Sequence, residues 1–158
     1  MSDKLLIYRD TQEKKDFWNF PPDNIFEGTE NLKLPTGDYT IKGFEKQFVI
    51  ERKRNTGELS NNITEERFER ELIRLEEFQW PFMVFDFDYK DIVNFPLGSG
   101  IPQWLHGKLK IKAAFFQSVI ARYQIAFKTK IIFAGRNNGE KVARELFKMV
   151  AKYGKPTQ

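Results

Sequence analysis

The feature that most constrains the fold is an alternation of apolar and polar residues between Gly37 and Arg54, GDYTIKGFEKQFVIERKR. A turn at residues 43–46 would join two strands, 38–42 and 47–53. Pairing across that turn gathers the apolar side chains on one face, whereas a slip of one residue would scatter them. These side chains are Tyr39, Ile41, Phe48 and Ile50. The pattern therefore predicts a β-hairpin with one face in a core.

The same register brings two acidic residues together at the open end of the hairpin. Asp38 and Glu51 would face each other directly on the more polar face. Like charges in that position destabilise a sheet by about 0.2–1 kcal/mol. Lys53 lies two residues after Glu51 and so shares its face, whereas Arg52 points to the other face.

Opposed carboxylates make chemical sense if a divalent cation lies between them. Mg²⁺ accepts one or two carboxylates, keeps several waters and completes its shell with substrate phosphate oxygens. Such an ion lowers the pKa of a bound water and polarises a phosphoryl group. Lys53 would then stabilise the charge that grows on the scissile phosphate, or hold the attacking water. The hairpin favours a phosphodiesterase site, and solvated charges at strand ends are the alternative interpretation.

The composition limits the class of protein. The chain has 158 residues, 41% hydrophobic with 16 Phe, which predicts a single folded domain over residues 1–158. The lack of cysteine and the single histidine, His106, exclude disulfides and thiolate or His-rich metal sites. No apolar run approaches the roughly 20 residues that span a bilayer, so we expect a soluble, cytoplasmic protein without a membrane partner. The net charge of +4 permits a phosphate-bearing partner without requiring one.

Periodicity places the remaining elements. It predicts strands at 5–8, 81–87 and 131–135 and helices at 64–78, 103–123 and 140–153. Thr64 is the expected N-cap of the first helix. Residues 14–36 are expected to be irregular and residues 54–63 to form a polar loop. A hairpin followed by alternating strands and helices favours an α/β fold, with a mixed sheet flanked by helices.

Several short motifs surround the hairpin in a fixed order. Gly37-Asp38 is followed by Glu51-Arg52-Lys53, and Leu34-Pro35 precedes both. Asp10-Thr11-Gln12-Glu13 follows the apolar run LLIYR, and RFERELIRL occupies residues 67–75. Together they resemble the XPF-type structure-specific DNA nuclease domain of the restriction-endonuclease-like superfamily. The signature of that family is G-D, then E-R-K-x-x-x-D, with V-D-x-R-E upstream.

The resemblance implies a restriction-endonuclease-like mixed central sheet with flanking helices. It also implies a Mg²⁺-dependent DNA endonuclease, with Mn²⁺ as a substitute, that cleaves branched or junction DNA in repair or recombination. Asp38, Glu51 and Asp10 look like the metal ligands and Lys53 looks like the catalytic lysine. Arg52 would be the accompanying arginine, supporting the site or contacting the substrate.

The sequence departs from the family signature at two positions. The last aspartate of E-R-K-x-x-x-D would fall at Gly57, and Glu58 would substitute as a ligand if the loop bulges there. Gln12 stands where the upstream element has arginine, and Glu13 matches its last position. These departures leave open a catalytically weakened or inactive DNA-binding or partner subunit. An end-acting exonuclease or repair nuclease of the same superfamily is a further alternative.

Basic and aromatic residues suggest where DNA would lie. The candidates for phosphate contacts are Lys53, Arg54, Arg67, Lys108 and Lys112. Of these, Lys108 and Lys112 would share a face of the predicted 103–123 helix, although a solvated helix face is the favoured explanation for most of the basic residues in this half of the chain. Arg67, Glu71 and Arg74 are expected to form a charged stripe on the 64–78 helix that flanks the site, with a simple Glu71–Arg67 pair as the alternative. Trp104 is expected to fill the core rather than to stack on a base, and Asp86 to be a solvated strand end.

The resemblance covers the nuclease domain and does not include the tandem helix-hairpin-helix module of larger family members. The chain therefore resembles a stand-alone nuclease domain, an arrangement found in phages and other mobile elements. A homodimer would have to form through the nuclease domain itself, and the last two helices are the expected surface.

Overall fold

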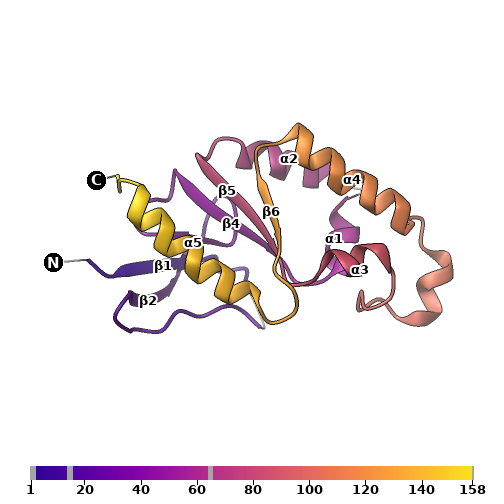
Figure 1. Cartoon of the computed structure of the whole chain (residues 1–158), viewed down its shortest axis with the longest axis horizontal. Helices are drawn as coiled ribbons and strands as arrows, with labels where there is room; N and C mark the ends of the chain where they lie inside the picture. Colours follow the sequence, from indigo (N-terminus) through magenta and orange to yellow (C-terminus); the bar gives the residue numbers. More distant parts are fainter. Residues whose placement is uncertain (1–2, 14–15, 64–65, 158) are drawn as a thin grey trace.

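The computed structural model describes residues 3–13, 16–63 and 66–157, without the side chain of Arg67. The described residues form a six-stranded mixed sheet in the order β2-β1-β3-β4-β5-β6 (Figure 1). The strands are β1 (Leu5–Arg9), β2 (Phe26–Asn31), β3 (Tyr39–Ile41), β4 (Phe48–Lys53), β5 (Trp80–Phe85) and β6 (Lys130–Phe133). β3 is antiparallel to both of its neighbours, whereas β4, β5 and β6 run parallel. The predicted α/β class with a mixed sheet is confirmed.

The hairpin has the register that the sequence predicts. Tyr39 pairs with Ile50, and the backbone N–H of Asp38 donates to the carbonyl of Ile50 at 2.8 Å. The apolar face is fully buried, as expected. The opposite face is buried too, because Thr40 is 2% and Val49 1% exposed. The interpretation of that face as polar therefore holds only at its open end, where the carboxylates lie.

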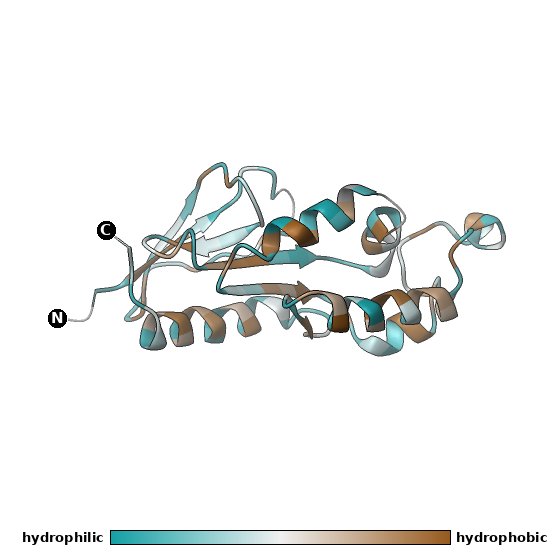
Figure 2. Ribbon diagram, turned by 90° about the horizontal axis from the view of Figure 1, so that it is seen from above, coloured by the Kyte–Doolittle hydropathy of each residue, from teal (hydrophilic) through white to brown (hydrophobic). Residues whose placement is uncertain are grey.

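Both faces of the sheet are covered because the strands lie between helices (Figure 2). On one face Phe147 and Ala143 of α5 (Gly139–Tyr153) pack on the apolar side of the hairpin, together with Trp18 and Phe20. The opposite face is covered by α1 (Thr56–Ile63), α2 (Glu66–Leu75) and α4 (Ala113–Ala126). Figure 1 shows α5 crossing the front of the sheet.

Residues 56–63 form α1 and not the expected polar loop. The side-chain Oδ1 of Asn55 accepts the backbone N–H of Glu58 at 2.7 Å, which caps the first turn. Leu59 and Ile63, one turn apart, are buried in the core. Asn55 followed three residues later by a glutamate is a helix-start signal that the sequence already contained. The expected cap of the next helix, Thr64, lies outside the described residues.

The single helix expected over 103–123 is wrong. The structure has a 3₁₀ helix η1 (Gln103–Lys108), an extended segment at 109–112 and then α4. In the extended segment Leu109 and Ile111 pack against the core and alternate with exposed lysines, which is the period of two of an extended chain. Lys108 and Lys112 therefore do not share a helix face. This part of the chain projects away from the sheet at the right of Figure 1.

Three smaller differences complete the comparison with the expected elements. The region 14–36 contains β2, which pairs in parallel with β1, and α3 (Tyr89–Val93) follows β5. Trp104 lies on the projecting segment with 73% of its surface exposed, so its expected place in the core is wrong.

Among the described helices, none is long and apolar enough to cross a membrane.

Candidate active site

The glycine before Asp38 is a local requirement of the hairpin. Gly37 has φ +82°, a conformation that residues with a side chain rarely adopt, and a Cβ there would clash with the side chain of Val49. The chain turns tightly at Gly37, so that Asp38 lies immediately before the first residue of β3, Tyr39. Its carboxylate Oδ2 accepts the backbone N–H of Arg52 at 2.8 Å, which holds the side chain beside β4.

A cavity of about 610 Å³ opens at this end of the hairpin, and we call it the carboxylate cavity. It brings together all five residues predicted to be catalytic: Asp10, Asp38, Glu51, Arg52 and Lys53. The other charged side chains that line it are Glu13, Lys33, Arg54, Glu58, Glu71 and Arg74. The sequence therefore identified the right set of neighbours, while their catalytic roles stay predictions.

The opposed carboxylates influence each other as expected. Burial, with the nearby charge of Glu13, raises the pKa of Asp38 to about 7. Burial also raises the pKa of Glu51 well above its ordinary value, and the charges of Asp38 and Glu71 raise it further. Ionisation of both carboxyl groups is therefore disfavoured unless a positive charge lies close to them.

Lys53 supplies one positive charge inside the cavity. Its Nζ donates to Asn62 Oδ1 at 3.1 Å and lies 3.4 Å from Glu51 Oε1 and 3.7 Å from Glu71 Oε1. Burial by itself lowers the pKa of Lys53, but the neighbouring carboxylates outweigh burial and raise it. Lys53 is therefore a charged ammonium group held beside the acidic side chains.

Glu71 lines the cavity, whereas the sequence interpretation placed it only in a charged stripe that flanks the site and paired it with Arg67. Its Oε1 is buried and accepts no hydrogen bond in the part of the chain that the structure describes. The expected partner, Arg67, has a side chain outside the described residues. A signal was available, because Phe68, Leu72 and Leu75 are the buried face of α2 and Glu71 lies at the edge of that face.

Asp10 ties two parts of the cavity wall together. Its Oδ1 accepts the backbone N–H of Leu34 at 2.8 Å, and its Oδ2 accepts that of Gln12 at 3.2 Å. The backbone N–H of Asp10 donates to the carbonyl of Asp38 at 2.8 Å. These contacts hold the segment before the Gly-Asp pair against the end of β1. The role of Asp10 as a metal ligand stays a prediction.

Gly57, where the signature has its last aspartate, and Glu58, the expected substitute ligand, lie in different surroundings. Gly57 is in the first turn of α1 and does not line the cavity, and a Cβ there would clash with the carbonyl oxygen of Ser99. The bulge expected at Gly57 is therefore wrong. Glu58 does line the cavity, but its Oε2 accepts the backbone N–H of Arg54 at 3.1 Å and its Oε1 lies 3.7 Å from Arg54 Nη1.

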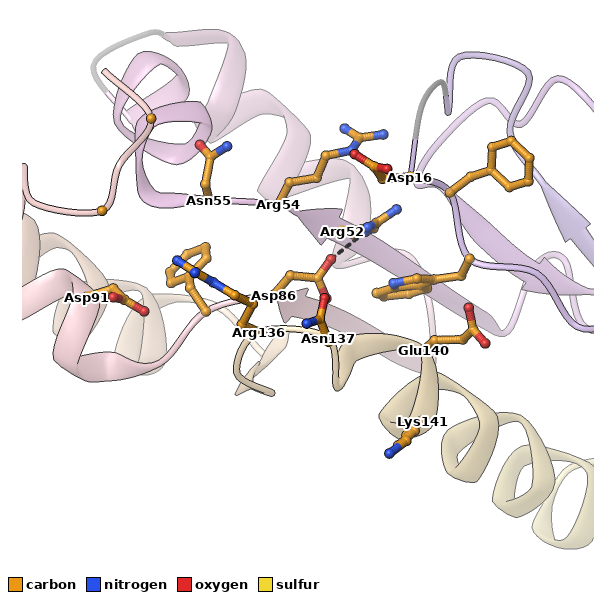
Figure 3. Close-up of a pocket in the computed structure, with 15 residues that line it drawn as sticks. Asp16, Arg52, Arg54, Asn55, Asp86, Asp91, Arg136, Asn137, Glu140 and Lys141 are labelled. Carbon is orange, nitrogen blue, oxygen red and sulfur yellow. Dashed lines mark hydrogen bonds and ion pairs between the residues drawn. The ribbon is translucent and has the colours of Figure 1, made fainter. Parts of the chain in front are cut away.

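Arg52 points to the other face of β4, as predicted, and is fully engaged there. Its Nε donates to Asp86 Oδ2 at 2.7 Å (Figure 3). Its Nη1 donates to Glu13 Oε2 at 3.1 Å. Glu13 also accepts from Arg54 Nη2 at 2.8 Å and from the hydroxyl of Tyr39 at 2.7 Å. Asp86 is therefore an ion-pair partner and not the expected solvated strand end.

A second cavity, of about 670 Å³, lies beyond this ion-pair network (Figure 3). Its charged lining contains four acidic and four basic side chains: Asp16, Asp86, Asp91 and Glu140, with Arg52, Arg54, Arg136 and Lys141. Arg52 and Arg54 line both cavities. Of the predicted phosphate contacts, Lys53 and Arg54 are at the carboxylate cavity, whereas Lys108 and Lys112 line neither cavity.

The donor set of the carboxylate cavity fits a hard divalent cation. Among the described residues, no three acidic, histidine or cysteine side chains are already spaced as a metal cage. Mg²⁺, however, needs only one or two carboxylates and keeps waters for the remaining positions. Asp38 and Glu51 supply these carboxylates, and the buried Glu71 Oε1 is an oxygen without a hydrogen-bond partner in the described chain.

Comparisons with known proteins bear on the family and the fold. Residues 28–138 match the ERCC4 domain family, and this range contains the hairpin, α1 and α2. Two solved structures, XPF from Aeropyrum pernix and the same protein in complex with DNA, each superpose with a TM-score of 0.63 at 17% sequence identity. In both cases the match covers 94% of this chain and 66% of the other chain. A comparison with curated protein sequences gave no significant match. The fold is that of XPF, which confirms the predicted restriction-endonuclease-like fold.

Proposed function

Because this chain belongs to the ERCC4 domain family, we propose that it is a metal-dependent DNA endonuclease that hydrolyses phosphodiester bonds. The observation that carries the proposal is the pair of opposed, largely covered carboxylates, Asp38 and Glu51, with the ammonium of Lys53 beside them. Such a pair destabilises the hairpin unless a cation neutralises it, so a catalytic role explains a feature that folding alone does not.

The residues of the carboxylate cavity have distinct parts in this reaction. Asp38 and Glu51 would hold Mg²⁺, or Mn²⁺ as its substitute, and Asp10 is the further acidic candidate. When bound, such an ion supplies a Lewis acid for the phosphoryl group and a water of lowered pKa. Lys53 stabilises the negative charge that grows on the scissile phosphate. Lys33 and Arg74, exposed at the cavity wall, are placed to contact the flanking backbone phosphates.

Branched or junction DNA is the proposed substrate class. Its support is family membership and the fold shared with XPF, one of whose solved structures is described as a complex with DNA. This chain spans 66% of the length of that protein, so the substrate of the whole protein is transferred only as a proposal. The proposed backbone contacts are those of Lys53, Arg54, Arg67, Lys108 and Lys112. In this proposal the protein acts inside a cell on repair or recombination intermediates.

A homodimer through the nuclease domain belongs to the same proposal. The last two helices leave large apolar side chains exposed: Phe115 and Ile125 on α4, and Met149 and Tyr153 on α5. Ile125 is 90% exposed, which is unusual for isoleucine. Light scattering after size-exclusion chromatography should give twice the monomer mass for the wild-type chain. A monomer at micromolar concentration would contradict the dimer without affecting the nuclease proposal.

The deciding experiment is cleavage of a labelled panel: flap, splayed arm, three-way and four-way junctions, plain duplex and supercoiled circle. Each substrate is incubated with Mg²⁺, Mn²⁺ or EDTA, with wild type beside Glu51→Gln. The proposal expects metal-dependent cutting of branched substrates that Glu51→Gln loses. Equal cutting by wild type and Glu51→Gln would contradict the assigned site. An end-acting exonuclease would leave the supercoiled circle intact.

Gly57 favours a second candidate, a catalytically weakened or inactive subunit that binds DNA or a partner. The signature aspartate is missing there, and the structure has no room for a side chain at that position. This candidate expects wild type to bind branched DNA in Mg²⁺ without cutting it. The same panel, run as a binding assay, separates the two candidates.

A further inference from the structure

We propose that Glu71, on α2, takes the place of the missing signature aspartate and is the third acidic ligand of the divalent cation. The inference rests on the proposed nuclease function, since it concerns the metal of that site. One ligand would then lie in the middle of α2 and not at the start of α1, where the signature aspartate would fall.

The first step is that a side chain at position 57 could not serve as a metal ligand. Gly57 packs against the segment at Ser99 and Ile101, and a Cβ would meet the backbone carbonyl of Ser99, which cannot move aside as a flexible side chain does. Gly57 is absent from the lining of the carboxylate cavity. An aspartate at this position would therefore strain α1 and would not reach the other carboxylates.

The second step is that Glu58, the neighbouring acidic residue, is already engaged. One of its oxygens accepts the backbone N–H of Arg54, and the other lies within ion-pair distance of the Arg54 guanidinium. These contacts close the first turn of α1. A cation at Glu58 would compete with the guanidinium of Arg54 for that carboxylate.

The third step is that Glu71 has an oxygen available where the charge is needed. Its Oε1 is buried without a hydrogen bond in the described chain, and it is 3.7 Å from the ammonium of Lys53. Asp38, Glu51 and Glu71 all line the carboxylate cavity, and the ammonium of Lys53 lies 3.4 Å from Glu51 and 3.7 Å from Glu71. Among the described residues they are not already spaced as a metal cage, so a bound cation would draw them together. A buried acceptor without a partner is costly, and a cation would satisfy it.

The fourth step is that α2 holds Glu71 rigidly. Phe68 and Leu72, on either side of Glu71 in the helix, are each 1% exposed in the core. The helix backbone is thus fixed on the sheet, and Glu71 reaches the cavity from its edge. A ligand held by a packed helix is positioned without a further loss of conformational freedom.

The test is Mn²⁺ binding to the whole chain without DNA, measured by electron paramagnetic resonance of free Mn²⁺. Wild type is compared with Glu71→Gln, Glu58→Gln and Asp38→Asn. The matched control is Glu69→Gln, on the same helix, where the side chain is half exposed and pairs with Arg122 at 3.3 Å. We expect Glu71→Gln to weaken Mn²⁺ binding by about 10- to 100-fold. Glu69→Gln should bind like wild type.

The outcomes separate this inference from the proposed function. If Asp38→Asn loses Mn²⁺ while Glu71→Gln binds like wild type, Glu71 is not a ligand and the nuclease proposal stands. If Glu58→Gln weakens binding and Glu71→Gln does not, Glu58 is the ligand and the inference is overturned. If wild type does not bind Mn²⁺ at millimolar concentration, the metal site itself is wrong and both proposals fall.

Two further variants keep the test decisive. Glu71→Asp retains the charge but withdraws it by one methylene, so its Mn²⁺ affinity should lie between those of wild type and Glu71→Gln. Affinity equal to wild type would contradict direct ligation, and this variant replaces Glu71→Gln if the latter does not fold. Gly57→Asp added to Glu71→Gln should not restore Mn²⁺ binding, because position 57 faces away from the cavity. Restored binding would overturn the inference.

Discussion

Two adjacent residues of β4 have opposite surroundings. Arg52 and Lys53 are both buried cations, 6% and 4% exposed, but they point to opposite faces of the strand. Arg52 makes short ion pairs with Asp86 and Glu13, at 2.7 and 3.1 Å, and Arg54 also neutralises Glu13. Lys53 lies at longer distances, 3.4 and 3.7 Å, from Glu51 and Glu71.

The difference separates a structural network from a candidate site. On the Arg52 face two arginines pair with two carboxylates, Glu13 and Asp86, so the charges balance, although Asp86 Oδ1 is buried without a hydrogen bond in the described chain. On the Lys53 face three carboxylates, Asp38, Glu51 and Glu71, surround one ammonium, and the pKa values of Asp38 and Glu51 are raised. An unmatched, buried excess of one sign of charge is typical of a functional site. The predictions below test this contrast.

The largest effect is expected from Asp38→Asn. It should lower the rate of Mg²⁺-dependent DNA cleavage by at least about 100-fold, since even second-shell changes at metal sites cost 10- to 100-fold. Circular dichroism should show an intact fold, because asparagine can still accept the backbone N–H of Arg52. A variant that unfolds yet cleaves normally per folded molecule would contradict the site.

On the opposite face, Arg52→Met should reduce stability and not only activity. Removing one partner of a buried ion pair leaves the other charge unmatched, which costs about 3–5 kcal/mol. Here the uncompensated groups would be Asp86 and Glu13. Urea denaturation should show a lower free energy of unfolding. A loss below about 1 kcal/mol would mean that the Arg52 network does not stabilise the fold.

The pH dependence of stability should distinguish the two faces further. The pKa of Asp38 is raised from 3.8 to about 7, so its protonated form stabilises the metal-free fold below pH 4. That contribution is lost as the pH rises through 7. Without divalent cations, Asp38→Asn should therefore be more stable than wild type at pH 8, by about 1–3 kcal/mol. The two should converge near pH 4.

Thermal unfolding in EDTA between pH 4 and pH 8 measures this difference. Mg²⁺ added at pH 8 should stabilise wild type and leave Asp38→Asn unchanged. A stability difference that is constant over this pH range would mean that Asp38 does not titrate as the structure indicates.

The smallest effect is expected away from both faces, on the projecting segment. Lys108→Ala and Lys112→Ala should each weaken DNA binding modestly and independently of sequence. Each should reduce the slope of log K against log salt concentration by about 0.9 if it removes one phosphate contact. Fluorescence anisotropy at several salt concentrations measures this slope, with Lys148→Ala as a control that removes a partly exposed lysine from α5. Slopes equal to that of wild type would exclude phosphate contacts at these positions.

Local periodicity was sufficient for the hairpin, its register and the opposed acidic pair. Only one alignment of the two strands keeps Tyr39 and Ile50 on the same buried face, and that alignment opposes Asp38 and Glu51. The start of α1 was also present locally, in Asn55 and the glutamate three residues later, but the polar composition of the segment suggested a loop. Similarly, the alternation of lysine with apolar residues at 108–112 indicated an extended chain.

The sequence by itself thus determined the α/β class, the hairpin and the residues at its open end, because strand pairing depends on neighbouring positions. Only the tertiary structure decided which charges become partners. Glu71 enters the cavity because α2 packs its apolar face on the sheet, and Glu13 joins Arg52 and Arg54 across about 40 residues of chain. Local spacing places Glu71 at the edge of the buried face of α2, but the partners that this edge meets depend on how the packed elements lie against one another.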